Sequence, residues 1–122
     1  MAVILVVDDD SDSRWMLASL MVRDGHTVIE AGDGLEASRL FRAYRPDVVL
    51  LDLFMPNQDG FQTIRELRRE FPTSRIIAVS AGWSVGKEDS MRRARVLGAD
   101  LTIRKPIDVD VMRHAVAELL AA

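Results

Sequence analysis

Short apolar runs rich in β-branched residues alternate with longer amphipathic segments along this chain of 122 residues. The apolar runs predict five strands, over residues 2–7, 27–31, 47–51, 75–79 and 100–104. The longer segments predict a first helix that ends at about residue 24 and four more over residues 35–44, 61–71, 84–97 and 108–120. Strands that alternate with helices pair in parallel through right-handed crossovers. The sequence therefore predicts an α/β fold, a doubly wound five-stranded parallel sheet with helices on both faces.

The first predicted helix has recognisable signals at both ends. Ser11, Asp12 and Ser13 have the short polar side chains that cap helix N-termini. Gly25 follows the last apolar positions, and glycine is favoured in the left-handed conformation just after a helix. We therefore expect one of the three capping candidates to start the helix and Gly25 to end it.

Composition excludes several classes of protein. The chain has no cysteine, which excludes disulfides, thiolate zinc sites and a cysteine nucleophile. Its net charge of −3 disfavours a nucleic-acid binder that works through an overall basic field. The longest apolar run covers residues 1–7, too short for a membrane helix, and we expect no secretory signal. We expect a cytoplasmic protein with no direct contact to nucleic acid or membrane.

The length suits one domain, because a typical domain takes about 100–200 residues. No linker, low-complexity segment or internal repeat interrupts residues 1–122. Met1 directly before the first predicted strand favours a native start. We therefore expect a single domain over residues 1–122, either as a stand-alone protein or as a part of a longer one.

Polar and charged residues follow four of the five predicted strands. In a sheet of this kind the functional site lies beyond the carboxyl ends of the strands, near the point where strand order reverses. The residues at these ends are Asp8, Asp9 and Asp10 after the first strand, Asp52 after the third, Ser80 after the fourth and Lys105 after the fifth. We expect these side chains to gather at one edge of the sheet.

The carboxylates of Asp8, Asp9 and Asp52 come together if the first and third strands are neighbours. Like charges at short range repel, so a divalent cation is the natural neutralising partner. Mg²⁺ prefers oxygen ligands, whereas a zinc site would need histidine or cysteine. Asp52 is the best nucleophile because it ends the central buried strand and enters a loop. With a metal ion, and with Lys105 and Ser80 near the phosphoryl oxygens, this set describes acyl-phosphate formation at an aspartate.

Five motifs occur in this order along the chain: VVDDD at 6–10, DLFMPNQDGF at 52–61, SAG at 80–82, GAD at 98–100 and KP at 105–106. On these motifs the whole chain resembles the response-regulator receiver domains of two-component signalling, the CheY-like superfamily. The resemblance implies the flavodoxin-like receiver fold, with five helices and strand order 2-1-3-4-5. It also implies a phosphorylation-dependent signalling switch, a cytoplasmic phosphoprotein of a phosphorelay. Such a protein is not an enzyme beyond its own phosphoryl transfer and slow autodephosphorylation.

The resemblance also implies a role for each matched residue, with Asp52 as the phosphoacceptor and Mg²⁺ as the cofactor. The expected metal ligands are Asp9, Asp52 and the backbone carbonyl of Phe54, with Asp8 binding through water. The expected contacts of the phosphoryl oxygens are Lys105, Ser80 and the backbone amides of Phe54 and Ala81. The expected phosphodonor is a sensor histidine kinase or a histidine phosphotransfer protein. The expected output is a downstream protein target or a fused output domain.

Three positions depart from the family pattern. Thr102 stands three residues before Lys105, where receiver domains usually carry Tyr or Phe, so an aromatic rotamer switch cannot operate there. Phe54 and Gly82 stand where polar side chains of relatives orient an attacking water. We therefore expect the acyl phosphate to hydrolyse slowly, with Phe54 as its shield.

Two other functions are kept as alternatives. Thr102 is the one feature that favours a receiver-like interaction module that works without phosphorylation. A small aspartyl-phosphate phosphohydrolase would generally carry an acid two residues after the nucleophile, where this chain has Phe54. A nucleotide-binding protein fits less well, since the first strand–helix turn is acidic rather than glycine-rich.

Several residues have a structural interpretation beside a functional one. Asp10 either joins the acidic site or compensates the dipole of the first helix, and the second role is favoured. Asp59 and Gly60 are favoured as a turn and helix cap over a catalytic pair. We expect His26 and His114 to be surface or helix-end residues.

Two surface features leave both interpretations open. Arg92, Arg93 and Arg95 form either a partner-binding patch or a solvated helix face. Trp15 lies near the start of the first helix, where family members dock their kinase, and it is also suited to packing within the domain.

Overall fold

The computed structural model of the chain describes residues 1–55, 58–81 and 87–122. Within these residues, five parallel strands form one sheet: β1 (Val3–Val7), β2 (Thr27–Ala31), β3 (Val48–Asp52), β4 (Ile76–Ser80) and β5 (Leu101–Arg104). Their order across the sheet is β2-β1-β3-β4-β5, which confirms the predicted order. The helices are α1 (Ser11–Arg23), α2 (Gly34–Tyr44), α3 (Gly60–Glu70), α4 (Lys87–Leu97) and α5 (Val109–Ala121).

The boundaries of these elements lie close to those that the sequence predicts. Each strand begins and ends within one residue of its predicted range. The predicted start of the fourth helix, at residue 84, lies outside the described residues. In the part of the chain that the structure describes, no helix combines the length and the hydrophobicity that a membrane crossing requires.

The prediction that Ser11, Asp12 or Ser13 caps α1 is wrong. The N-cap is Asp10, whose carboxylate accepts a hydrogen bond from the backbone N–H of Ser13 at 3.2 Å. Aspartate caps a helix as well as serine does, and Asp10 directly precedes the three candidates, which already lie within the helix. At the other end Gly25 has a φ of 89°, the left-handed conformation that was predicted there.

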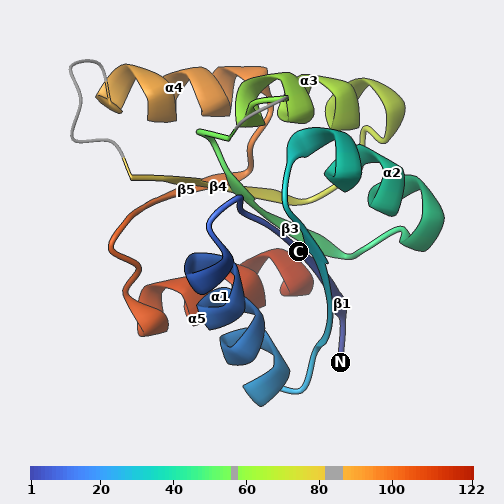
Figure 1. The fold of residues 1–122 in the computed structure, drawn as a ribbon, viewed down its shortest axis with the longest axis vertical. Helices are drawn as coiled ribbons and strands as arrows, with labels where there is room; N and C mark the ends of the chain where they lie inside the picture. The colour runs from blue at the N-terminus through green and yellow to red at the C-terminus, as the bar shows by residue number, and fades with distance from the viewer. Residues whose placement is uncertain (56–57, 82–86) are drawn as a thin grey trace.

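Two hydrophobic cores lie on the two faces of the sheet (Figure 1). Helices α1 and α5 cover one face, and α2, α3 and α4 cover the other. Successive residues of β3 alternate between these cores. Val48 and Leu50 pack on the side of α1 and α5, whereas Val49 and Leu51 pack on the opposite side. All five residues of β3 are buried, as expected for the central strand of a doubly wound sheet.

Candidate functional site

The pairing of β1 with β3 brings two of the candidate segments together. Val7 lies opposite Leu51 in the parallel register. The residues that follow them, Asp8 and Asp52, therefore reach the same edge of the sheet from adjacent strands. Strand β4 pairs with β3 on its other side, and Ser80 is the last residue of β4. The carboxyl edge of the sheet thus collects candidate residues from three neighbouring strands.

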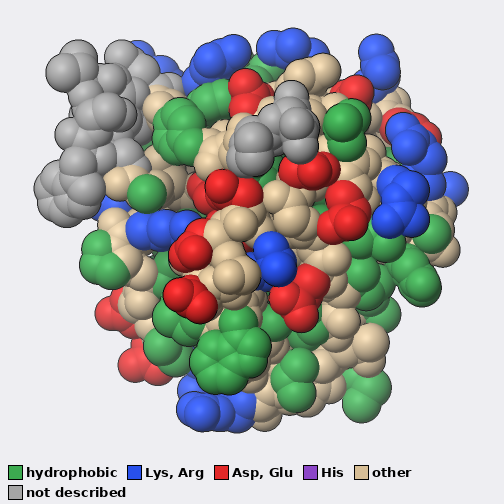
Figure 2. All heavy atoms as spheres, in the orientation of Figure 1, with side chains coloured by type: hydrophobic (Ala, Val, Ile, Leu, Met, Phe, Trp, Pro, Cys, Tyr) green, Lys and Arg blue, Asp and Glu red, His purple; other side chains and the backbone are tan. Residues whose placement is uncertain are grey.

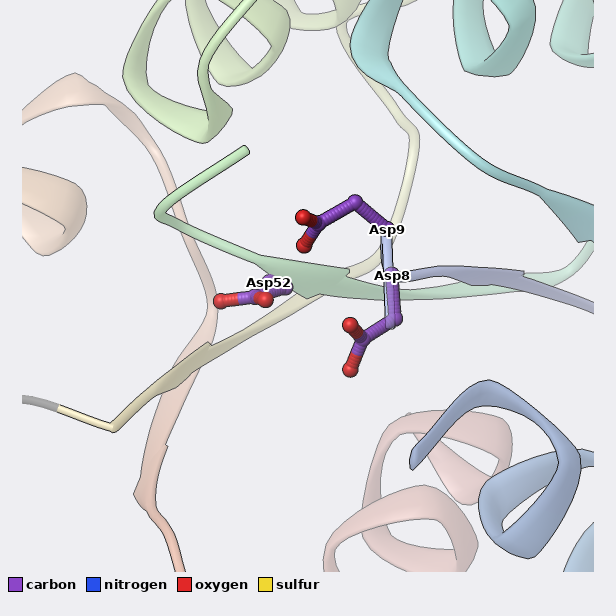
Figure 3. A group of neighbouring side chains, drawn as sticks. All are labelled: Asp8, Asp9 and Asp52. Carbon is purple, nitrogen blue, oxygen red and sulfur yellow. The ribbon is translucent and has the colours of Figure 1, made fainter. Parts of the chain in front are cut away.

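The side chains of Asp8, Asp9 and Asp52 converge at this edge (Figure 3). One carboxylate oxygen from each lies within 4.8 Å of the other two. Asp8 and Asp52 are buried, with exposed fractions of 1% and 7%, whereas Asp9 is exposed. Figure 2 shows acidic side chains gathered in the middle of the face of the molecule that is in view, with basic side chains among them. A cluster built from carboxylates alone fits a hard divalent cation such as Mg²⁺ better than zinc.

Lys105, which follows β5, lies beside the carboxylates. Its Nζ atom is 2.9 Å from Oδ2 of Asp8 and 3.7 Å from Oδ2 of Asp52. The ammonium also donates to the hydroxyl of Ser13 at 3.4 Å. The backbone N–H of Lys105 donates to the carbonyl of Ser80 at 2.8 Å, which ties the segment after β5 to the end of β4. The site therefore combines clustered negative charge with one ammonium that faces it.

Burial is the largest electrostatic influence on the carboxyl group of Asp52. Burial raises the pKa of Asp52 from 3.8 to about 6, because removal from water disfavours the charged form. The charge of Lys105 and the N–H of Phe54 lower this pKa, and the charges of Asp8 and Asp9 raise it. Burial lowers the pKa of Lys105, but the hydrogen bond to Asp8 and the nearby carboxylates outweigh burial and leave that pKa raised. The ammonium therefore keeps its charge beside an unusually basic carboxylate.

Arg14 of α1 fixes the turn that presents the acids, and the sequence analysis missed it. Its guanidinium donates to the backbone carbonyl of Asp8 at 2.9 Å and to the carboxylate of Glu30 at 3.1 Å. The carboxylate of Asp8 also accepts a hydrogen bond from the N–H of Asp10 at 2.9 Å. These bonds hold both the main chain and the side chain of Asp8. No motif in the sequence marks Arg14, because one partner follows β1 and the other lies in β2.

The start of α3 packs directly against the main chain at the end of β3. A Cβ atom at Gly60 would lie 2.5 Å from Cα of Leu53 and 2.7 Å from the carbonyl oxygen of Asp52. The N–H of Gly60 donates to the carbonyl of Leu53 at 2.9 Å. The N–H of Phe54 donates to the carboxylate of Asp52 at 3.2 Å. Glycine is therefore required at position 60 because two backbones approach closely there.

Gln58 anchors the loop after β3 on α3, and it is a second residue that the sequence analysis missed. The side chain is buried, and its Nε2 atom donates to Oγ1 of Thr63 at 3.1 Å and to Oε2 of Glu66 at 2.8 Å. Its neighbour Asp59 is the N-cap of α3 and accepts a hydrogen bond from the N–H of Gln62 at 2.9 Å. The structure thus gives Asp59 the capping role that was favoured.

Four further residues were considered in the sequence analysis: Ala81, Gly82 and the two histidines. Ala81 follows β4 and is exposed, and Gly82 lies outside the described residues. The Nδ1 atom of His26 accepts a hydrogen bond from the N–H of Ala2 at 3.2 Å, and His114 is exposed on α5. Neither histidine belongs to the acidic cluster.

The three arginines of α4 differ in their contacts with the rest of the domain. The guanidinium of Arg93 lies over the ring of Phe61, 4.3 Å from the ring centroid. Arg95 donates to the hydroxyl of Thr102 at 3.1 Å. Arg92 is exposed, as is Trp15 on α1 with an exposed fraction of 69%. Arg93 and Arg95 thus make contacts within the domain, and Trp15 is not a core residue.

The sequence model of the response regulator receiver domain matches residues 4–117 of this chain. The chain belongs to this family. The resemblance on five motifs is therefore confirmed, and the chain is a receiver domain of two-component systems. The acidic cluster lies at the carboxyl edge of the receiver sheet, where its three carboxylates gather.

Known proteins similar to this receiver domain include signalling proteins of its own length. The chemotaxis protein CheY of Halobacterium salinarum is 31% identical over 98% of this chain and 97% of the relative. The sporulation initiation phosphotransferase F of Bacillus subtilis is 32% identical over 96% of this chain and 92% of the relative. Among solved structures, a CheX–CheY–BeF3–Mg complex from Borrelia burgdorferi matches with a TM-score of 0.88 and 28% identity. That match covers 97% of this chain and 88% of the other.

Proposed function

We propose that this receiver domain, a single domain over residues 1–122, is a phosphorylation-dependent signalling switch with Asp52 as its acceptor. One observation carries the proposal. One carboxylate oxygen from each of Asp8, Asp9 and Asp52 lies within 4.8 Å of the other two, and the ammonium of Lys105 lies 3.7 Å from Asp52. Phosphoryl transfer to an aspartate needs a positioned carboxylate and positive charge near the phosphoryl oxygens, and this set supplies both.

The chemistry of the donor set fits Mg²⁺ as the cofactor. The residues that would hold it are Asp9, Asp52 and the backbone carbonyl of Phe54, with Asp8 acting through water. The ion supplies charge neutralisation for the phosphoryl oxygens when it is bound. A cation near Asp52 also opposes the effect of burial on the pKa of its carboxyl group, and so favours the ionised nucleophile.

Residues of the chain itself supply the nucleophile and the groups that stabilise the transferred phosphoryl oxygens. A carboxylate oxygen of Asp52 bonds to the phosphorus of a phosphohistidine, and the bond from phosphorus to the imidazole nitrogen breaks with its electrons staying on the imidazole. The product is an acyl phosphate on Asp52. Lys105, Ser80 and the backbone amides of Phe54 and Ala81 stabilise the charge on the transferred oxygens.

The partners follow from this chemistry. The donor is a sensor histidine kinase or a histidine phosphotransfer protein, and the output is a downstream protein target or a fused output domain. The phosphoryl group adds about −1.5 to −2 charge at neutral pH, which biases the loops after β3 and β4 between two conformations. The Borrelia burgdorferi relative, solved as a complex of CheX with CheY, supports a protein partner. We propose a cytoplasmic location, with no direct contact to nucleic acid or membrane.

Slow autodephosphorylation is the only further reaction in this proposal, so the protein is a switch and not a turnover enzyme. Phe54 has no polar group to orient an attacking water. A phosphohydrolase would instead release phosphate continuously from small phosphate esters. A turnover assay on such esters therefore separates the two functions.

Intact mass spectrometry tests the proposal. The wild-type protein and the Asp52→Asn variant are incubated with Mg²⁺ and a small acyl-phosphate donor, with a chelator in a parallel sample. We expect one phosphoryl group on the wild type, none on the variant and none without Mg²⁺. The same result with a phosphohistidine protein as donor would identify the class of partner. A wild type that stays unmodified with every donor, although folded, would contradict the proposal.

One observation favours an interaction module that works without phosphorylation. The hydroxyl of Thr102 accepts a hydrogen bond from Arg95 at 3.1 Å, which holds a small side chain at the position where relatives carry a mobile ring. If binding of a partner proved equal for the phosphorylated protein and for Asp52→Asn, this module would be the better description.

A further inference from the structure

A series of three contacts leads from the acceptor to helix α4. The N–H of Phe54 donates to the carboxylate of Asp52 at 3.2 Å. The ring of Phe54 meets the ring of Phe61 edge-on, with 6.0 Å between the centroids and 80° between the planes. The guanidinium of Arg93 lies over the ring of Phe61, 4.3 Å from its centroid. These contacts connect the loop after β3, helix α3 and helix α4 in that order.

Helix α4 is held from two sides by arginines. Arg93 reaches α3 through Phe61, and Arg95 reaches β5 through the hydroxyl of Thr102 at 3.1 Å. Successive helix residues are about 100° apart, so residues two apart point to nearly opposite sides. Of these two contacts, the one made by Arg93 leads back to the acceptor loop. Figure 1 shows α3 and α4 next to each other on the same face of the sheet.

The two rings differ in how firmly the rest of the fold holds them. Phe61 is buried, with an exposed fraction of 6%, and belongs to a hydrophobic core. Phe54 has an exposed fraction of 46%, so much of its ring is in contact with water. The edge-on contact with Phe61 is therefore a substantial constraint on where the ring of Phe54 lies. A cation on Phe61 draws electron density to the ring face and orients the ring that Phe54 contacts.

We propose that Arg93 is a positioning residue for the phosphoryl group on Asp52. It acts through Phe61 to hold Phe54 beside the acceptor, so the position of α4 sets the rate at which the phosphoryl group is lost. A partner that draws Arg93 away from Phe61 shortens the lifetime of the phosphorylated state. This inference rests on the proposed function, because it concerns the group that Asp52 accepts.

A double-mutant cycle tests the inference. The variants are Arg93→Ala, Phe54→Leu and the two combined, with Arg92→Ala as the matched control on the same helix. Each full-length protein is phosphorylated with a small acyl phosphate, the donor is removed, and loss of the group is followed by intact mass. We expect Arg93→Ala to lose it about two- to five-fold faster, the factor that corresponds to about 0.5–1 kcal/mol for a cation–π contact. We expect Arg92→Ala to match the wild type.

The cycle also distinguishes a route through the rings from a general effect on the fold. Phe54→Leu removes the ring, so adding Arg93→Ala to it should leave the rate of Phe54→Leu unchanged. An equal acceleration by Arg93→Ala with and without the ring would overturn the inference. Equal rates for Arg93→Ala and Arg92→Ala in a protein that does accept the phosphoryl group would overturn the inference and leave the proposed function standing. A wild type that accepts no phosphoryl group would overturn both. If Arg93→Ala does not fold, Arg93→Gln takes its place in the same cycle.

Discussion

Lys105 donates a hydrogen bond of 2.9 Å to the carboxylate of Asp8, which lies 97 residues earlier in the chain. Strands β3 and β4 lie between β1 and β5 in the sheet, so this bond spans the carboxyl ends of both intervening strands. Asp8 is almost fully buried, with an exposed fraction of 1%, and a buried carboxylate needs a charged partner. The same ammonium faces Asp52 at 3.7 Å, so one cation lies beside both the buried Asp8 and the proposed phosphoacceptor.

Replacement of Lys105 should separate phosphoryl transfer from metal binding. In Lys105→Met we expect the rate of phosphorylation by a small acyl phosphate to fall about tenfold or more, because a positioned donor to the phosphoryl oxygens is lost. Mg²⁺ affinity, measured by titration, should be unchanged or higher, since the carboxylates lose a competing cation. Arg104→Met removes an exposed neighbouring charge and should change neither quantity. A variant that is phosphorylated at the wild-type rate would contradict the role of Lys105.

The raised pKa of Asp52 predicts how stability changes with pH in the absence of Mg²⁺. The pKa rises from 3.8 to about 6 on folding, so the folded state binds this proton more tightly. Stability from this group is therefore present at low pH and is lost as the pH rises towards 6. Asp52→Asn cannot ionise, so we expect it to be more stable than the wild type by about 1–2 kcal/mol at pH 7.5. The advantage should shrink at pH 4.5. Urea unfolding at both pH values measures it, and equal stability of the two proteins at pH 7.5 would contradict the cause given for the shift.

Gly60→Ala should damage the acceptor segment, because the new Cβ would lie 2.5 Å from Cα of Leu53. We expect a loss of about 1–3 kcal/mol in the free energy of unfolding, the usual cost of overpacking. Gly32→Ala is the matched control, since its Cβ would meet only Nη1 of Arg14, at an ordinary distance of 3.6 Å. Equal unfolding midpoints in denaturant for the two variants would show that α3 does not press on the acceptor backbone.

Arg68 should stabilise the fold without affecting the chemistry. Its guanidinium donates to the carbonyl of Gly98 at 2.7 Å, to the carboxylate of Asp100 at 2.6 Å and to the carbonyl of Ser74. These partners lie at the amino ends of β4 and β5, at the opposite edge of the sheet from the acidic cluster. Arg68→Met should lose about 2–3 kcal/mol of stability, because charged hydrogen bonds to partly buried groups are removed.

The control for that variant is Arg69→Met, whose side chain is exposed next to Arg68. Arg69→Met should unfold at the same denaturant concentration as the wild type. Both variants should accept the phosphoryl group at the wild-type rate under conditions where they are folded. A slow rate in folded Arg68→Met would mean that the amino end of the sheet also influences the site.

Phe54→Asn tests the idea that the residue two positions after the acceptor limits hydrolysis. An amide side chain can orient a water molecule toward the acyl phosphate, whereas the phenyl ring cannot. We expect the phosphoryl group to be lost several-fold faster in the variant, as followed by intact mass after donor removal. A decay rate that is unchanged or lower would remove Phe54 from the explanation of lifetime.

Most of the fold could be predicted because its signals are local. Each strand is a short apolar run, and each turn after a strand carries polar residues or glycine. The alternation of strands and helices predicts parallel pairing, but it does not determine the order of the strands, which the family resemblance supplied. The cap of α1 was missed by one residue, since Asp10 also stood among the candidates for the acidic site. An aspartate at this position can either cap the helix or join the acidic site, and the sequence alone does not distinguish the two roles.

The candidate site could be predicted where its residues end a strand, as Asp52 and Ser80 do, or directly follow one, as Asp8 does. The parallel register then brings them to one edge. Arg14 and Gln58 could not be found in this way, because Arg14 reaches the carbonyl of Asp8 from α1 and Gln58 bonds to α3 from the loop after β3. Such contacts depend on tertiary packing, and no periodicity or motif records them.

The role of Asp52 as the phosphoacceptor is tested most directly by locating the phosphoryl group on the chain. Protein phosphorylated by a small acyl phosphate in Mg²⁺ is reduced with borohydride, which converts a phosphorylated aspartate to homoserine, and the peptides are then analysed by mass spectrometry. We expect homoserine at position 52 and intact aspartate at Asp8 and Asp9. Conversion at position 8 or 9, or conversion at position 52 that persists without Mg²⁺, would contradict it.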